Sequence, residues 1–219
     1  YITIATTGDA TDFGDLTTTP YDPAACSNGI RGVFAPGHDG SSYLDVIEYI
    51  TIATTGNAID FGNLSIAKFR MAACADVTYG LFGGGFSGSG NPLNTIEYVT
   101  IATAGNATDF GDLVVNRYEA GSCSGTTRGL FGGGDTTSNT RINAIDYVTI
   151  ATAGNATDFG DLSSNVRRLA ACSDATKGVF GGGAGINVIE YVTIDTTGNA
   201  TDFGDLLASV YYHASCAGT

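Results

Sequence analysis

Tryptophan is absent from the 219 residues of this chain, and methionine occurs once. Leucine, glutamate and lysine, which favour helices, are scarce, whereas glycine occurs 32 times. The sequence has no apolar run of roughly eighteen residues or more, which excludes a membrane-spanning helix. Apolar residues nevertheless make up 43% of the chain and can fill a core. We therefore expect an all-β protein with many tight turns.

Positive charge is also in short supply. Nine Lys and Arg residues stand against 22 Asp and Glu residues, which gives a formal net charge of −13 at pH 7. A charge of this sign repels the phosphates of nucleic acids and the surface of an anionic membrane. We therefore expect no nucleic acid partner and no membrane insertion.

One segment recurs five times, and its copy at 147–162 reads YVTIATAGNATDFGDL. The tyrosines that open the copies recur every 44 to 49 residues: Tyr1, Tyr49, Tyr98, Tyr147 and Tyr191. A period of this length is typical of β-propeller blades. The sequence thus predicts a single domain over 1–219, with repeats 1–48, 49–97, 98–146, 147–190 and a partial repeat 191–219. Because the chain begins in mid-repeat without an initiator methionine, we expect a fragment of a longer protein or a processed form.

Each repeat contains four short extended runs bounded by turn residues, as in LAACS (169–173), KGVFGGG (177–183), IEYVTIAT (96–103) and TDFGDL (157–162). Four antiparallel strands make one blade. The small, cysteine-bearing run predicts the innermost strand, and the recurring phenylalanines are expected to pack between blades. We predict five blades, with the closing blade shared between the two chain ends: 1–16 as its third and fourth strands and about 210–217 as its innermost strand. Its second strand would come from further sequence or from a partner.

These runs resemble the kelch-type propeller. Paired glycines end the second strand (Gly83 and Gly84), and aromatic residues follow in the third and fourth strands (Tyr98 and Phe110). Phenylalanine stands where kelch repeats carry tryptophan, and the first copy, FAPGHDG at 34–40, lacks the glycine pair. The sequence motif YVTIATxGNATDFGDL, together with RGLFGGG, also resembles repeats of uncharacterised structural proteins of marine bacteriophages. That resemblance implies a virion surface or tail-fibre protein, assembled in the host cytoplasm, with other virion proteins or a host surface molecule as partners.

Two repeated motifs suggest enzymes but have simpler explanations. DFG binds magnesium in protein kinases only beside an HRD catalytic loop, which is absent here, and the motif occurs once per repeat. GGGFSG at 83–88 matches the dinucleotide fingerprint, but no helix is expected after it. Only two histidines occur, His38 and His213, and no Ser/His/Asp or Cys/His set recurs. We predict no enzymatic activity, no catalytic residue and no cofactor.

Other recurring side chains are interpreted as structural. The cysteines lack the spacing of metal ligands, so we expect small, buried, unpaired thiols, which favours folding in a reducing compartment: Cys26, Cys74, Cys123, Cys172 and Cys216. Asn106, Asn155 and Asn199 head glycosylation sequons but also suit a left-handed position in a hairpin turn. Asp109 and Asp112 do not have the spacing of a calcium loop, so no metal site is predicted.

The copies differ in two classes of loop, which a propeller places on the same face. The first class joins the outermost strand of one repeat to the innermost strand of the next, as in SIAKFRM (65–71), and the second class follows the glycine run, as in FSGSGNPLNT (86–95). Six of the nine basic residues lie there, and aromatic residues accompany them. Cations and aromatic rings together are typical of surfaces that hold sugars or protein partners. We therefore predict a binding face built from Tyr21, Phe69, Arg70, Arg117, Tyr118, Arg141, Arg167, Arg168, Tyr211 and Tyr212.

Two functions remain open at this point. The first is a non-enzymatic virion module, part of a larger assembly or a homo-oligomer, that recognises a host glycan or a protein. The alternative is a secreted sugar-binding lectin that resembles five-bladed propellers of the tachylectin type. Identical sites in every blade favour the lectin, whereas a single asymmetric patch favours the virion module.

Overall fold

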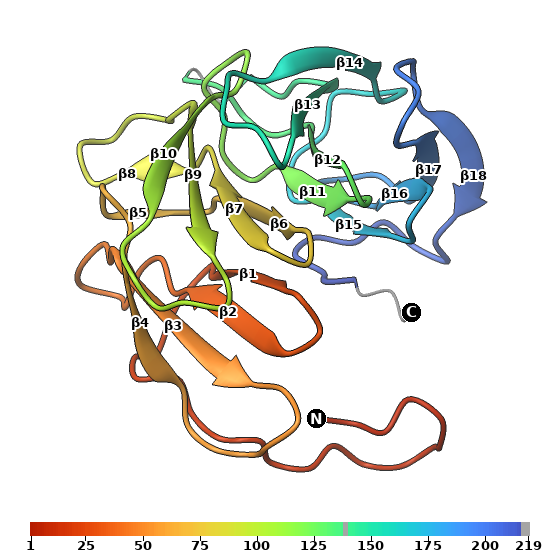
Figure 1. Ribbon diagram of the computed structural model, residues 1–219. Coiled ribbons are helices and arrows are strands. Elements are labelled where there is room, and N and C mark those ends of the chain that lie inside the picture. Colours follow the sequence, from red (N-terminus) through yellow and green to blue (C-terminus); the bar gives the residue numbers. More distant parts are fainter. Residues whose placement is uncertain (138–139, 216–219) are drawn as a thin grey trace.

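The computed structural model describes residues 1–137 and 140–215, and every regular element in this part of the chain is a β-strand (Figure 1). Sheet 1 consists of β1 (Ala24–Ser27), β2 (Arg31–Ala35), β3 (Val46–Thr51) and β4 (Ile59–Asn63). Sheet 2 consists of β6 (Ala72–Ala75), β7 (Tyr79–Gly83), β9 (Thr95–Thr100) and β10 (Thr108–Asp112). Sheet 3 consists of β11 (Gly121–Ser124), β12 (Arg128–Gly132), β13 (Ala144–Thr149) and β14 (Thr157–Asp161). Sheet 4 consists of β15 (Ala170–Ser173), β16 (Lys177–Gly181), β17 (Val188–Thr193) and β18 (Thr201–Asp205). The short strands β5 (Lys68–Phe69) and β8 (Phe86–Ser87) pair separately.

The four antiparallel sheets stand side by side around a common axis, which is a propeller-like arrangement (Figure 1). The first strand of each sheet contacts the first strand of the next, in the order β1, β6, β11 and β15. Alanine, serine and cysteine residues of these strands, together with Ser215, line a narrow cavity along the axis. The prediction that the cysteine-bearing strand is innermost is thereby confirmed.

The repeated DFG motif forms a β-bulge in the outermost strand. In sheet 2 the pairing of β10 with β9 shifts register between Asp109 and Gly111, so Phe110 is the extra residue. The bulge turns the Phe110 ring into the core, where only 4% of the residue remains exposed. Gly111 has a φ of 145°, and a Cβ there would lie 2.5 Å from the carbonyl oxygen of Gly154 in the next sheet. Close approach of two backbones therefore requires the glycine, and the motif is structural.

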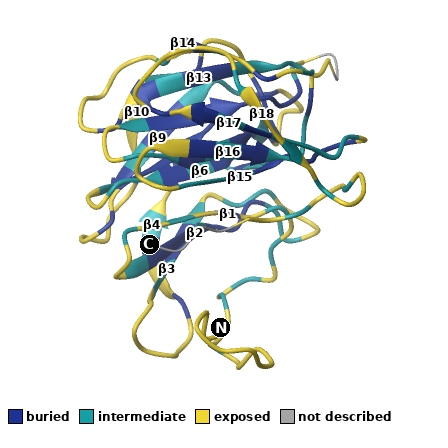
Figure 2. Cartoon of the chain, turned by 90° about the vertical axis from the view of Figure 1, so that its right-hand side faces the viewer, coloured by how far each residue is buried: buried dark blue, intermediate teal, exposed yellow. Residues whose placement is uncertain are grey.

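The strands of neighbouring sheets are largely buried where the sheets meet (Figure 2), and glycines permit this close contact. A Cβ on Gly129 in β12 would lie 2.7 Å from Sγ of Cys74 in sheet 2, and one on Gly132 would lie 2.9 Å from the Phe180 ring of sheet 4. Cys74, Phe131 and Phe180 are buried at these contacts. The prediction that phenylalanines pack between the sheets is confirmed at these positions.

The two chain ends depart from the expected fifth sheet. Residues 1–16 contain no strand, although the amide of Thr11 donates to the carbonyl of Tyr1 at 2.8 Å, as in the hairpins of the complete sheets. This N-terminal hairpin contacts sheet 1, since the amide of Gly56 donates to the carbonyl of Phe13. Residues 206–215 also contain no strand, and His213 Nε2 lies 2.8 Å from the carbonyl oxygen of Gly181 in sheet 4.

Both segments lie beside the same gap between sheet 4 and sheet 1 (Figure 1). The described residues thus form four complete four-stranded sheets, not five. The remainder of the expected innermost strand, which includes Cys216, lies outside the described residues.

Candidate functional site

The two classes of variable loop pair with each other next to the innermost strands of the sheets. In sheet 1 an isolated bridge joins Tyr21 to His38, and in sheet 3 another joins Tyr118 to Asp135. In sheet 2 the equivalent pairing is longer and forms β5 and β8. The two loop classes therefore build one surface, here called the loop face, as the sequence predicted.

One residue in each loop of the first class has a left-handed backbone, at the same position in every repeat. The φ angles are 52° for Asp22, 55° for Arg70, 57° for Glu119, 59° for Arg168 and 53° for Tyr212. Residues other than glycine seldom adopt this conformation. Hydrogen bonds between repeats accompany it, because the amide of Glu119 donates to the carbonyl of Arg70 at 3.0 Å and the amide of Arg168 donates to that of Glu119 at 2.8 Å. The fold thus brings five side chains together, and we call them the axial ring.

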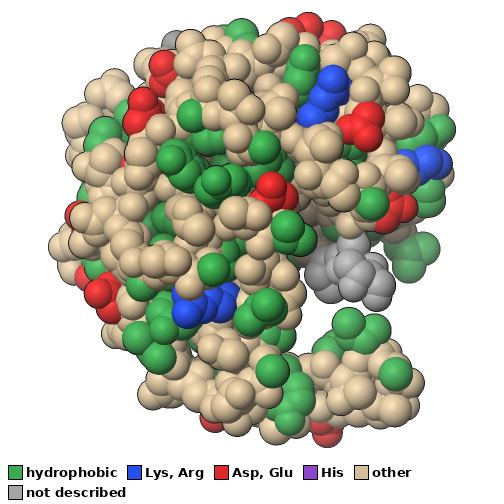
Figure 3. Space-filling model, viewed as in Figure 1, with side chains coloured by type: hydrophobic (Ala, Val, Ile, Leu, Met, Phe, Trp, Pro, Cys, Tyr) green, Lys and Arg blue, Asp and Glu red, His purple; other side chains and the backbone are tan. Residues whose placement is uncertain are grey.

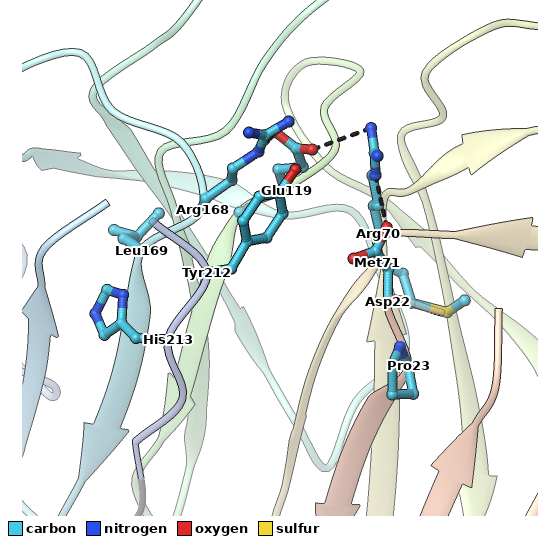
Figure 4. Close-up of a pocket in the computed structure, with 10 residues that line it drawn as sticks. Asp22, Pro23, Arg70, Met71, Glu119, Arg168, Leu169, Tyr212 and His213 are labelled. Atoms are coloured by element: carbon cyan, nitrogen blue, oxygen red, sulfur yellow. Dashed lines mark hydrogen bonds and ion pairs between the residues drawn. The ribbon is translucent and has the colours of Figure 1, made fainter. Parts of the chain in front are cut away.

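Charges alternate around the axial ring (Figure 4). Arg70 Nε lies 2.9 Å from Asp22 Oδ2, and Arg70 Nη1 lies 3.1 Å from Glu119 Oε1. Arg168 Nε lies 2.8 Å from Glu119 Oε2, and its guanidinium stacks 4.2 Å from the ring centroid of Tyr212. The five side chains surround an open hollow of about 190 Å³, which Met71, Leu169 and His213 also line. Hydrogen-bond donors, acceptors and an aromatic ring therefore face one solvent-accessible site.

Electrostatics favour the charged form of Arg70 and of the neighbouring Arg167. Burial alone would lower the pKa of Arg70, but the hydrogen bond to Asp22 and the negative charges of Glu119 and Asp22 outweigh it and raise the pKa. Arg167, which pairs with Asp135 and lies 3.6 Å from Glu119, has its pKa raised in the same way. The side chain of Glu119 is only 3% exposed and lies within 4 Å of the guanidinium groups of Arg70, Arg167 and Arg168.

Arg117 and Tyr118 lie beneath the loop face, although the sequence placed them on it. Arg117 is 1% exposed, and its Nη2 lies 2.8 Å from Asp146 Oδ2 in β13. Its Nη1 donates to the carbonyl oxygens of Ala144, Gly133 and Phe131. Tyr118 is 6% exposed, and its ring centroid lies 5.1 Å from that of Phe86. Both side chains therefore support the surface from below.

Lys68 repeats this buried arrangement in sheet 2. Its Nζ lies 2.9 Å from Glu97 Oε2, and both side chains are enclosed. Burial lowers the pKa of Lys68 even though Glu97 acts to raise it. Burial acts to raise the pKa of Glu97, but the charge of Lys68 and hydrogen bonds from Ser65 outweigh it and lower the pKa. In sheet 3 burial prevails on both partners, so the pKa of Arg117 is lowered and that of Asp146 is raised.

The remaining predicted residues are spread over the loop face. Tyr21 is 63% exposed, whereas Phe69 is half-buried between the rings of His38, Tyr43 and Phe86. Arg141 is exposed and its Nη1 donates to the carbonyl of Ala184 at 3.1 Å. Tyr211 is 57% exposed. Of the predicted set, the structure brings Arg70, Arg168 and Tyr212 into one site, with Arg167 beside it.

Sequence reasoning missed the acids of the site. Asp22 and Glu119 occupy the same repeat position as Arg70 and Arg168, so an alignment of the repeats by column would have found them. It also missed the buried carboxylates beneath the face. The sequence signal for these carboxylates is an acid inside an otherwise apolar strand, as Glu97 in TIEYV and Asp146 in AIDYV. Glu97 follows Lys68 at the same distance in sequence as Asp146 follows Arg117.

The asparagines of the opposite, turn-bearing face have a different role from the expected one. They do not adopt left-handed φ. Instead the side-chain oxygen accepts the backbone amide of the preceding sheet's outermost strand, as for Asn155 with Asp112 at 3.1 Å and Asn199 with Asp161 at 3.1 Å. Asn57 and Asn106 do the same with Asp15 and Asn63, at 3.0 Å each. These asparagines connect neighbouring sheets, which explains why the turns hardly vary.

The cysteines within the described residues are unpaired. Burial raises the pKa of Cys123 to about 12, and burial also raises that of Cys74 well above its ordinary value. No group of three or more His, Cys, Asp or Glu side chains within residues 1–137 and 140–215 could hold a metal ion. The same part of the chain contains no helix long and apolar enough to cross a membrane.

Comparison with known proteins gives no family. No protein-family model matches the chain, and no curated protein sequence is significantly similar to it.

Proposed function

We propose that this chain is a non-enzymatic recognition module built as a kelch-like propeller of five blades. Four blades are the complete sheets, and the fifth position is shared by residues 1–16 and 206–215. The register of the N-terminal hairpin supports this sharing, because Tyr1 opposes Thr11 as Tyr98 opposes Thr108 in sheet 2. The hollow at the axial ring is its binding site.

The axial ring is the observation that carries the proposal. Each repeat contributes one side chain to it, and four residue types occur among the five, whereas on the turn face the same asparagine contact joins successive repeats from Asn57 to Asn199. Residues that only support the scaffold are expected to be the same in every repeat, whereas a ligand requires particular side chains at particular positions. In the axial ring itself, the left-handed backbone that directs the side chains to the axis recurs in every repeat.

The chemistry of the ring suits a sugar. Tyr212 is 57% exposed and offers an aromatic face on which a sugar ring stacks. Arginine and carboxylate groups alternate beside it and can donate to and accept from hydroxyl groups. We therefore favour a host glycan as the ligand, with a protein partner as the other candidate.

The ring is single and asymmetric, which favours the virion module over a lectin with one site per blade. The resemblance of the repeats to marine bacteriophage structural proteins supports a place at the virion surface or in a fibre. The proposed localisation is the virion.

Glycan arrays and binding to host cells test this function. Arg168→Ala and Tyr212→Ala should each weaken binding at least tenfold. Tyr212→Ala should change the melting temperature little because Tyr212 is 57% exposed, whereas the Arg168 side chain is only 17% exposed and also pairs with Glu119. Thr152→Ala, on an exposed turn of the opposite face, is the matched control and should bind as the unchanged chain does. Unaltered binding by both loop-face variants, loss of binding in the control, or no binding to any glycan or cell would each overturn the proposal.

A further inference from the structure

The second strand of a complete sheet makes two kinds of contact with the preceding complete sheet and one within its own sheet. Its glycine receives the cysteine of the earlier sheet: a Cβ would lie 2.7 Å from Cys26 Sγ at Gly80, 2.7 Å from Cys74 Sγ at Gly129 and 2.6 Å from Cys123 Sγ at Gly178. Its phenylalanine packs on a glycine of the earlier sheet, as Phe131 does on Gly83 and Phe180 on Gly132. Its first residue stacks on the tyrosine of its own third strand, as Arg31 on Tyr49, Arg128 on Tyr147 and Lys177 on Tyr191.

The gap after sheet 4 leaves the corresponding positions open. Within residues 1–137 and 140–215, a Cβ on Gly181, the counterpart of Gly83 and Gly132, would meet no atom nearer than 3.7 Å, and the nearest belongs to Ile189 of the same sheet. Cys172 is partly exposed, whereas Cys74 and Cys123 are buried. Val179, the counterpart of the fully buried Leu81 and Leu130, is also partly exposed.

Apolar side chains stand unpartnered on both sides of this gap. Phe203 of β18 is 65% exposed, while its counterpart Phe61 is 3% exposed beneath Val99 and Ile101 of the next sheet. The residues equivalent to Val99 and Ile101 in the N-terminal hairpin are Ile2 and Ile4, which are 62% and 84% exposed. Figure 3 shows this gap, with hydrophobic side chains on both of its sides.

The two flanking parts of a fifth sheet are already in place. The N-terminal hairpin meets sheet 1 through the same bonds that join complete sheets, since Asn57 accepts the amide of Asp15 as Asn106 accepts that of Asn63. A Cβ on Gly182 would meet Val210 and His213, as one on Gly133 would meet Val166 and Leu169 in the preceding repeat. The outer half and the innermost segment therefore flank a second-strand position that no described residue occupies.

We infer that this position is a docking site for an extended segment with the sequence pattern of β2, β7, β12 and β16. The pattern is a cationic or aromatic residue, then glycine, then valine or leucine, then phenylalanine. The first residue stacks on Tyr1, the glycine accommodates Cys172, and the phenylalanine packs on Gly181. By the register of the complete sheets, the first three residues pair with Thr3, Ile2 and Tyr1. The inference rests on the five-position architecture proposed above but not on the ligand of the axial ring.

Docking of the segment also explains how the exposed apolar side chains on the two sides of the gap become covered. In complete sheets the turn between third and fourth strands meets the previous sheet's outermost strand, as Gly198 does with Phe159. Among the described residues, a Cβ on Gly204 in β18 would meet nothing within 4 Å, whereas one on its counterpart Gly160 would lie 2.4 Å from the carbonyl oxygen of Gly198 in the next sheet. Once the second strand is present, the hairpin turn closes on β18, and Ile2 and Ile4 cover Phe203.

A synthetic peptide tests the site on the 219-residue chain. The peptide has the sequence of residues 125–134, which include the complete pattern, and carries a fluorescent label at its amino end. We expect saturable binding by fluorescence anisotropy, a higher melting temperature and less binding of a hydrophobic dye. Control peptides with Gly129→Val or Phe131→Ala should bind at least tenfold more weakly.

A variant of the chain locates the binding. Gly181→Ala places its methyl group in open space and should leave the melting temperature of the free chain unchanged, yet it should weaken peptide binding because it meets the incoming phenylalanine. Failure of the parent peptide to bind, equal binding of the control peptides, or unchanged binding by Gly181→Ala would overturn the inference. Burial of the exposed apolar side chains beside the gap by a second copy of the chain without peptide, detected by light scattering and loss of dye binding, would also overturn it. None of these measurements depends on glycan binding.

Discussion

The turn face and the loop face stabilise the same four sheets in different ways. On the turn face each pair of neighbouring sheets makes the same modest contacts, such as the Asn106 and Asn155 hydrogen bonds. On the loop face the acid of each third strand likewise accepts one backbone amide of the loop before its sheet, but only two of these acids also form buried ion pairs, Glu97 with Lys68 and Asp146 with Arg117. Stabilisation is therefore distributed evenly on one face and concentrated at a few positions on the other. A loop-face cation can thus be essential for folding without being available to a ligand.

The largest effect is expected where the loop face concentrates its charge. Arg117→Ala leaves Asp146 buried without its cation and should lower the free energy of unfolding by about 3–5 kcal/mol. Urea unfolding followed by circular dichroism measures the loss. Arg141→Ala removes an exposed arginine of the same face and should change it by less than about 0.5 kcal/mol. Equal effects of the two variants would show that Arg117 is not part of the support beneath the face.

A smaller loss is expected at the contact between complete sheets. Gly132→Ala places a Cβ 2.9 Å from the Phe180 ring, so the neighbouring sheets must separate slightly. The cost should be about 1–3 kcal/mol in the free energy of unfolding. Gly181→Ala, at the equivalent position beside the gap, should cost almost nothing. A similar loss in the two variants would mean that the gap is closed in solution.

The buried thiols predict a decline of stability in alkali. The pKa of Cys123 is raised from an ordinary 9.0 to about 12 because burial disfavours the thiolate. The stabilisation by this thiol is therefore complete below about pH 9 and is lost as the pH rises toward 12, because the unfolded chain releases the proton first. Between these pH values the free energy of unfolding should fall by about 1.4 kcal/mol per pH unit. Urea unfolding between pH 7 and pH 10.5 should show a shallower decline for Cys123→Ala than for the unchanged chain. Parallel declines would contradict the buried thiol.

The smallest effect is expected on the turn face. Asn155→Ala removes one solvent-exposed hydrogen bond between sheets 2 and 3 and should lower the free energy of unfolding by about 1 kcal/mol. Thr152→Ala in the same turn keeps that bond and should be close to neutral. If both changes were neutral, the repeated asparagine would need an explanation other than sheet-to-sheet bonding.

Much of the fold followed from the repeat alone. A period of 44 to 49 residues, four apolar runs per period and small residues in the first run were sufficient to predict four-stranded sheets with the cysteine-bearing strand innermost. The structure confirms both predictions. Local pattern determines strands because alternation fixes which face of a strand is apolar. The same reasoning identified Arg70, Arg168 and Tyr212, since each breaks the repeat in a loop.

Tertiary structure decided which of these side chains reach the surface. Arg117 and Arg168 both lie in loops of the first class, yet one is buried against Asp146 of β13 and the other stacks on Tyr212 of the next repeat. The sequence determined the strands because their pattern is local. The environment of a loop side chain is set by residues about thirty positions or one repeat away, so the assignment of Arg117 to the core and Arg168 to the axial ring emerged only once the sheets were packed together.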